Sequence, residues 1–171
     1  MTTNLAAPMK YLFFIIISSF ISTSSICQER ISGKVVSIAD GDTFTILTEG
    51  NKQVKIRFYG IDCPESGQDF GTKAKQFTSS LAFSKTVSVQ IEDIDRYGRT
   101  IGIVTLPDST ILNEQLLKAG LAWHYKRYDK SEKYAALETE AKVRKVGIWS
   151  MINQIAPWEY RKAARSYDQS N

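Results

Sequence analysis

Five short runs rich in β-branched and aromatic residues constrain the fold of this chain most strongly. Runs of this length, bounded by turn-forming residues such as Gly, Asp and Asn, are typical of β-strands. Because few helical segments lie between them, we expect the strands to close into a small Greek-key barrel. The runs span residues 31–38, 43–48, 53–59, 86–91 and 100–106.

Three further segments have the apolar spacing and end signals of helices. The first covers residues 71–83, the second residues 112–119, and the third runs from a cap at Ser131 to Gly147. We therefore expect an α+β chain that is mainly β, with a five-stranded Greek-key barrel, possibly of the OB-fold type, and three α-helices. An aromatic tail from about residue 151 is expected to pack over the core.

The N-terminal segment resembles a secretory signal peptide. It has one basic residue and no acidic one, then an apolar run over residues 11–21 and small residues before Gln28. We expect residues 1–27 to be removed, leaving one domain over residues 28–171 that is secreted or periplasmic and free of the membrane. The alternative is an uncleaved anchor over residues 11–26, although this run is shorter than a spanning helix requires.

The composition limits the chemistry available to the chain. Its 171 residues include two Cys and one His, which excludes a multi-Cys zinc module and any site that needs two histidines. The formal net charge is +4, and it is spread unevenly. Residues 28–116 hold 10 basic and 12 acidic residues, whereas residues 117–171 hold 11 basic and 6 acidic ones. The basic part is either a solvated helix face or a surface for a polyanion.

A predicted hairpin brings acidic residues together at one end. Gly50-Asn51 reads as a two-residue turn, which would place Phe44 opposite Arg57. Asp42 and Asp62 would then meet where the chain enters and leaves the hairpin. Two neighbouring carboxylates suit a hard divalent cation held by oxygen ligands, although Asp-Gly-Asp is also ordinary turn chemistry.

The residues that follow add groups suited to hydrolysis. Pro64 stiffens a non-helical loop that carries Asp62 and Glu65, so that one carboxylate could hold a metal while the other handles a water molecule. Arg57 and Arg99 could converge on a phosphodiester whose charge grows in the transition state. The alternative for each arginine is structural pairing with a nearby acid.

Taken in order, these motifs resemble the staphylococcal-type thermonucleases over roughly residues 32–150. This family consists of calcium-dependent secreted nucleases with an OB-fold barrel and three helices. The motifs are Asp40-Gly41-Asp42-Thr43, the run RFYGIDCPE from Arg57 to Glu65, Asp95-Arg96-Tyr97-Gly98-Arg99, Leu112-Asn113-Glu114, Gly120-Leu121-Ala122 and Gly147-Ile148-Trp149-Ser150.

The resemblance implies a role for each matching residue. Asp42, Asp62 and the main-chain carbonyl of Cys63 would bind Ca²⁺, and Asp40 would support them. Glu65 would be the general base, while Arg57 and Arg99 would clamp the phosphate. Substrate contacts are implied for Arg96, Tyr97, Tyr125 and Tyr128.

The implied activity is endonucleolytic hydrolysis of DNA and RNA to 3′-phosphate ends by a monomer without a stable protein partner. The loop over residues 66–71 is shorter than in the family and lacks its lysines, which bears on substrate affinity. His124, the lone histidine, is expected to be structural. The alternative function is a non-catalytic OB-fold module that binds nucleic acid or peptide.

Overall fold

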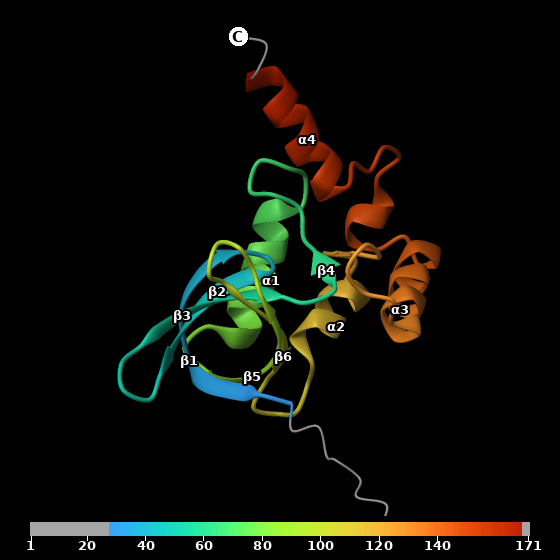
Figure 1. Cartoon of the computed structure of the whole chain (residues 1–171). Helices are drawn as coiled ribbons and strands as arrows, with labels where there is room; N and C mark the ends of the chain where they lie inside the picture. The colour runs from blue at the N-terminus through green and yellow to red at the C-terminus, as the bar shows by residue number, and fades with distance from the viewer. Residues whose placement is uncertain (1–27, 169–171) are drawn as a thin grey trace, which may run out of the picture.

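The computed structural model describes residues 28–168 (Figure 1). The segment expected to be a signal peptide, residues 1–27, lies outside the described residues. Within the described part, none of the helices combines the length and the apolar character needed to cross a membrane.

Five strands form the closed barrel that the sequence predicts. Their order is β1-β2-β3-β6-β5, with β3 and β6 parallel and the other neighbours antiparallel. Two short strands, β4 and β7, form a separate sheet beside the barrel that the sequence patterns do not reveal. The strands are β1 (Arg30–Asp40), β2 (Thr43–Thr48), β3 (Gln53–Phe58), β4 (Ile61–Asp62), β5 (Thr86–Ile94), β6 (Thr100–Thr105) and β7 (Trp123–His124).

Four α-helices and one 3-10 helix accompany the barrel, so the predicted count of three is short by one. The three expected helices are confirmed in place, and the Ser131 side chain caps α3 by accepting a hydrogen bond from the Tyr134 amide. The additional helix, α4, starts at Pro157, within the aromatic tail that is expected to pack over the core and for which no helix is predicted. The helices are α1 (Gly71–Ala82), α2 (Leu112–Lys118), α3 (Glu132–Val143), η1 (Gly147–Ser150) and α4 (Pro157–Asp168).

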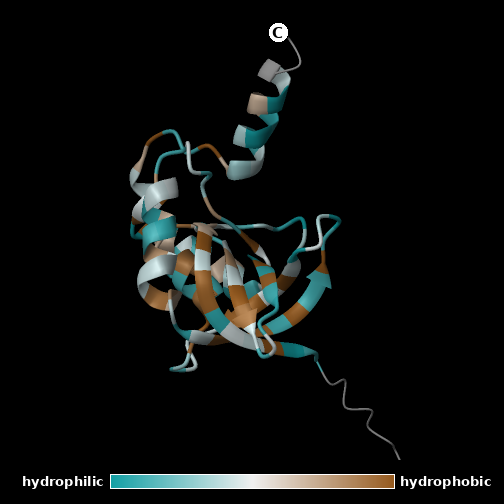
Figure 2. Cartoon of the chain, turned by 90° about the vertical axis from the view of Figure 1, so that its left-hand side faces the viewer, coloured by the Kyte–Doolittle hydropathy of each residue, from teal (hydrophilic) through white to brown (hydrophobic). Residues whose placement is uncertain are grey.

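The main core fills the barrel and extends under α1, α2 and α3. Along β2 and β3, buried Phe44, Ile46, Ile56 and Phe58 point inward, and the rings of Phe44 and Phe58 meet edge to face at 5.0 Å. Apolar residues accordingly line the barrel in the hydropathy view (Figure 2). A smaller cluster built around Trp149 packs near the C-terminal end.

The hairpin register differs by one residue from the prediction. Thr43, not Phe44, lies opposite Arg57, because the turn contains three residues rather than two. The Thr48 amide donates to the Lys52 carbonyl, and both Gly50 and Asn51 adopt positive φ values between them. The slip reverses which side chains share a face, yet Asp42 still comes to the same end of the hairpin as Arg57.

Candidate active site

The site lies where the β1–β2 turn meets the segment that follows β3. Gly41 sits so close to Cys63 that an added Cβ would lie 2.8 Å from the Cys63 Cβ. The Asp42 carboxylate accepts a hydrogen bond from the Cys63 amide at 2.6 Å, and the Thr78 hydroxyl of α1 donates to the Gly41 carbonyl at 2.5 Å. These contacts fix the acidic turn against the loop that carries Asp62.

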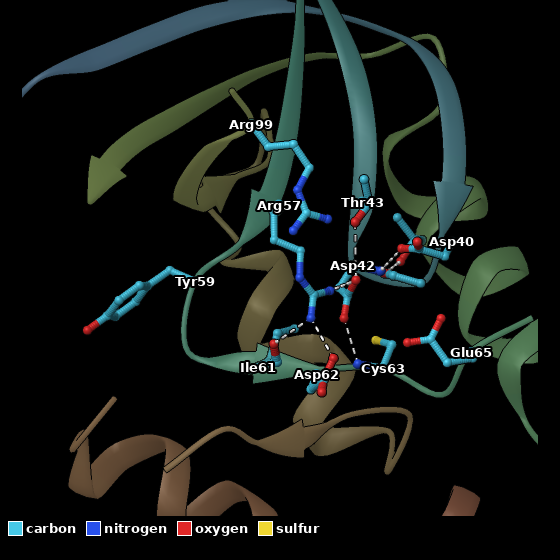
Figure 3. A network of polar contacts seen from close by, with 12 residues as sticks. Asp40, Asp42, Thr43, Arg57, Tyr59, Ile61, Asp62, Cys63, Glu65 and Arg99 are labelled. Carbon is cyan, nitrogen blue, oxygen red and sulfur yellow. Dashed lines mark hydrogen bonds and ion pairs between the residues drawn. The ribbon is translucent and has the colours of Figure 1, made fainter. Parts of the chain in front are cut away.

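Arg57 joins the two central carboxylates (Figure 3). Its guanidinium forms ion pairs with Asp42 and, at 2.5 Å, with the Oδ1 atom of Asp62. The side chains of Asp42 and Asp62 are only 3% and 1% exposed. Because buried carboxylates without a cationic partner are costly, Arg57 is structurally required in this arrangement. The predicted meeting of Asp42, Arg57 and Asp62 is therefore observed.

Glu65 lies at the rim of this cluster on a loop held by local hydrogen bonds. Its amide donates to the Gln68 side chain at 3.0 Å, and its carbonyl accepts from the Gln68 amide at 2.9 Å. An added Cβ at Gly71 would lie 2.0 Å from the Glu65 carbonyl oxygen, so only glycine allows this approach of α1. The Glu65 side chain is 36% exposed, in contrast to the buried aspartates.

Asp40 lies beside these groups and caps the acidic turn. Its Oδ1 atom accepts a hydrogen bond from the Asp42 amide at 3.1 Å. This hydrogen bond closes the turn between Asp40 and Asp42. Asp40 itself forms no ion pair among the described residues.

Arg99 directly precedes β6, the parallel neighbour of β3, and points toward Arg57 (Figure 3). Its own acidic partner is Asp95, at 2.7 Å from both Nε and a terminal nitrogen. Burial alone would raise the pKa of Asp95, but hydrogen bonds from the backbone and side chain of Arg99 outweigh it and lower that pKa. The Arg99 side chain is 30% exposed, which leaves it accessible to an anion.

Of the predicted substrate contacts, Arg96 and Tyr97 lie on the exposed turn next to Arg99. The Arg96 guanidinium donates to the Tyr97 hydroxyl at 2.7 Å and also lies 4.9 Å from the centre of its ring. The Arg99 guanidinium lies 5.8 Å from the same ring centre. The three side chains therefore form one continuous surface beside the carboxylate cluster.

Tyr125 and Tyr128 are brought together after β7, with ring centroids 4.9 Å apart. Tyr128 is exposed, but one face of Tyr125 is already covered. The Trp158 indole of α4 stacks on it with centroids 5.0 Å apart and rings almost parallel. The predicted stacking surface is thus shared with a residue of the C-terminal helix.

Sequence reasoning missed Arg161. This residue of α4 pairs with Asp62 at 2.7 Å and also with Glu65, from a position 96 residues further along the chain than Glu65. Trp158 and Arg161 are three residues apart and therefore share one face of α4, but this spacing does not indicate a contact with Asp62 or Glu65.

The donor chemistry of the cluster fits a hard divalent cation. Asp42 and Asp62 have carboxylate oxygens, and Cys63 has a main-chain carbonyl, all ligands that Ca²⁺ accepts. Among residues 28–168, no group of three or more His, Cys, Asp or Glu side chains is gathered as a metal cage. A cation here would therefore rely on the two aspartates, backbone oxygen and water.

Cys63 and His124 are both buried. Burial raises the pKa of the Cys63 thiol well above its ordinary value, which keeps it a neutral thiol rather than a thiolate ligand. The His124 Nε2 atom lies 2.7 Å from Asp129, and its backbone pairs with Ile61 of β4. The backbone of His124 thus ties β7 to β4, the strand that ends at Asp62.

Comparison with known proteins identifies the family. The family model described as "Staphylococcal nuclease homologue" matches residues 55–151. An "Uncharacterized endonuclease" of Haemophilus influenzae is 38% identical over 143 residues, covering 84% of this chain and 80% of that protein. The chain belongs to the staphylococcal nuclease homologue family.

Two further relatives agree with this assignment to the staphylococcal nuclease homologue family. A "Micrococcal nuclease" of Shigella flexneri is 38% identical over 145 residues, covering 78% of this chain and 82% of that protein. An "Uncharacterized endonuclease" of Escherichia coli is 37% identical over 142 residues, covering 83% of this chain and 92% of that protein. The matched region contains the whole segment from Arg57 to Glu65 and the Arg99 turn.

Proposed function

We propose that this protein is a Ca²⁺-dependent endonuclease that hydrolyses phosphodiester bonds of DNA and RNA to 3′-phosphate ends. The observation that supports this most directly is the pair of buried carboxylates, Asp42 and Asp62, joined by Arg57 with the exposed Glu65 at their edge. Membership in a nuclease family supports a nucleic-acid substrate. The calcium dependence and the 3′-phosphate ends follow from the resemblance to the thermonucleases.

In this proposal Asp42, Asp62 and the main-chain carbonyl of Cys63 would hold Ca²⁺, which when bound would help to neutralise the phosphate. Glu65 accepts a proton from the water that attacks phosphorus. The bond from phosphorus to the 5′ oxygen breaks, and solvent protonates the leaving oxygen. The phosphate stays on the 3′ side of the cut.

The arginines stabilise the charge that develops on the phosphate oxygens. Arg57 is already held between two aspartates, so it needs little reorganisation to meet a third anionic group. Arg99 is held by Asp95 but is 30% exposed, which leaves donors for the substrate. Arg96, Tyr97, Tyr125 and Tyr128 contact the nucleotides beyond the cut, the aromatic rings by stacking.

Cleavage of plasmid DNA and of RNA with Ca²⁺, and in excess chelator, tests this activity. We expect cleavage with Ca²⁺ only, and end-group analysis should find 3′-phosphate. Cleavage that persists in chelator would contradict the metal dependence. Salt-sensitive oligonucleotide binding without any cleavage would instead favour a non-catalytic binding module.

We also propose that residues 1–27 are a cleaved signal peptide and that the protein acts outside the cytoplasm as a monomer. The support is the apolar run at residues 11–21, which has signal-peptide length. Mass spectrometry of the N-terminus of the exported protein should find Gln28 first. Retention of residues 11–26 would indicate a membrane anchor.

A further inference from the structure

The Arg161 guanidinium lies between the carboxylates of Asp62 and Glu65, to which the proposed function gives different roles. One terminal nitrogen lies 2.7 Å from the Oδ2 atom of Asp62, and the other lies 3.2 Å from Oδ1 of the same residue. The second nitrogen also bonds to Glu65. Asp62 is the proposed metal ligand and Glu65 the proposed base, so a single side chain contacts both.

These contacts make Arg161 a strongly held cation. Partial burial alone would lower its pKa, but hydrogen bonds to Asp62 and Glu65 outweigh that effect and raise it. Paired guanidinium–carboxylate bonds of this kind use both oxygens of the acid. Arg57 also bonds to Oδ1 of Asp62 at 2.5 Å, so arginines contact both oxygens of this carboxylate. A divalent cation that needs lone pairs of these oxygens must therefore displace at least one of the two arginines, and among the described residues Arg161 alone holds Oδ2.

Contacts near its start hold the helix that carries Arg161. Pro157 is buried, and Trp158 stacks on Tyr125 at 5.0 Å and packs against the Trp149 cluster. The Gln68 side chain donates to the Ile155 carbonyl at 3.1 Å, and the Tyr160 hydroxyl approaches Gly67. Beyond its first turns α4 projects away from the barrel (Figure 1). The side chains that follow Arg161, through Ser166, are exposed. Such an attachment can be released without unfolding the barrel.

We propose that Arg161 is a positioning residue that holds Asp62 and Glu65 until a divalent cation displaces it, and thereby sets the affinity for that cation. The proposal rests on the proposed function for the identity of the cation. Trp158 supports it by docking α4 on Tyr125. Release of Arg161 would also free Glu65 to accept a proton.

Calcium binding to the full chain tests the proposal without relying on activity. We expect Arg161→Gln to bind Ca²⁺ about fivefold more tightly than the wild type in calorimetric titration, as for the loss of a partly exposed ion pair. The control is Lys162→Gln, which removes the same charge from the next position of α4. Lys162 forms no side-chain ion pair among the described residues, so we expect wild-type affinity.

A second variant separates competition from a change in net charge. Trp158→Ala leaves Arg161 in place but removes its docking contact, so calcium affinity should again increase. In wild-type protein, Ca²⁺ should also increase hydrogen exchange in α4 while the barrel strands stay protected.

Equal affinities in the Arg161 and Lys162 variants, or weaker binding by Arg161→Gln, would overturn the proposal and leave the nuclease assignment intact. Absence of calcium binding in the wild type and in every variant would overturn both.

Discussion

Replacing Arg57 by Gln should destabilise the fold strongly when no divalent cation is present. The Arg57 side chain is 15% exposed, and it neutralises two aspartates whose side chains are 3% and 1% exposed. Removing one partner of a buried ion pair typically costs about 3–5 kcal/mol. Arg161 still pairs with Asp62, so we expect about 3 kcal/mol, at the lower end of that range.

Urea denaturation in chelator measures this change, and thermal unfolding should show a decrease in Tm of about 10 °C for a domain of this size. Added Ca²⁺ should restore part of the stability, because a bound cation replaces the missing positive charge between Asp42 and Asp62. Arg30→Gln is a matched control, since among residues 28–168 the exposed side chain of Arg30 hydrogen-bonds only to that of Gln90. A variant at Arg57 within about 0.5 kcal/mol of the wild type would refute the reasoning, because that is the usual range of surface substitutions.

Three other outcomes follow from buried groups. Burial would raise the pKa of Glu138, but hydrogen bonds from Lys142 and a second lysine lower it below 4.5; Glu138→Gln should therefore cost about 1–2 kcal/mol at neutral pH, and urea titrations should show this difference vanish as pH falls through the folded-state pKa. Gly71→Ala should lower the free energy of unfolding by about 1–3 kcal/mol and slow cleavage, because the Cβ of alanine would collide with the Glu65 carbonyl. Thermal unfolding measures this change, and an unchanged Tm would contradict it. The buried Cys63 thiol should be labelled only after denaturation, as peptide mass spectrometry can check, and rapid native labelling would argue against its burial.

The barrel could be predicted because its strands carry strong local signals. β2 runs over residues 43–48, as the β-branched pattern of TFTILT predicts, and Ser131 caps α3 through a bond that depends only on nearby residues. The hairpin register could not be predicted in the same way. Gly50 and Asn51 both favour positive φ, and that preference fits either a two-residue or a three-residue turn.

The candidate site was predictable where one hairpin positions it. Asp42, Arg57 and Asp62 meet because the chain enters and leaves β2 and β3 at one end, and a slip of one residue does not change this. Arg161 reaches the same carboxylates through tertiary packing of α4, with a sequence separation of 99 residues from Asp62. No local pattern around Arg161 specifies that contact, and the two-residue strands β4 and β7 are equally dependent on packing.

Cleavage of a defined oligonucleotide by wild-type protein and Glu65→Gln, compared side by side in Ca²⁺, tests the proposed nuclease site most directly. Glutamine preserves the size of the side chain and removes its ability to accept a proton. The account predicts that the rate falls by about 10²- to 10⁴-fold, the usual contribution of a general base, while circular dichroism and oligonucleotide binding stay close to wild type. An undiminished rate in Glu65→Gln would contradict the assignment of this carboxylate as the base.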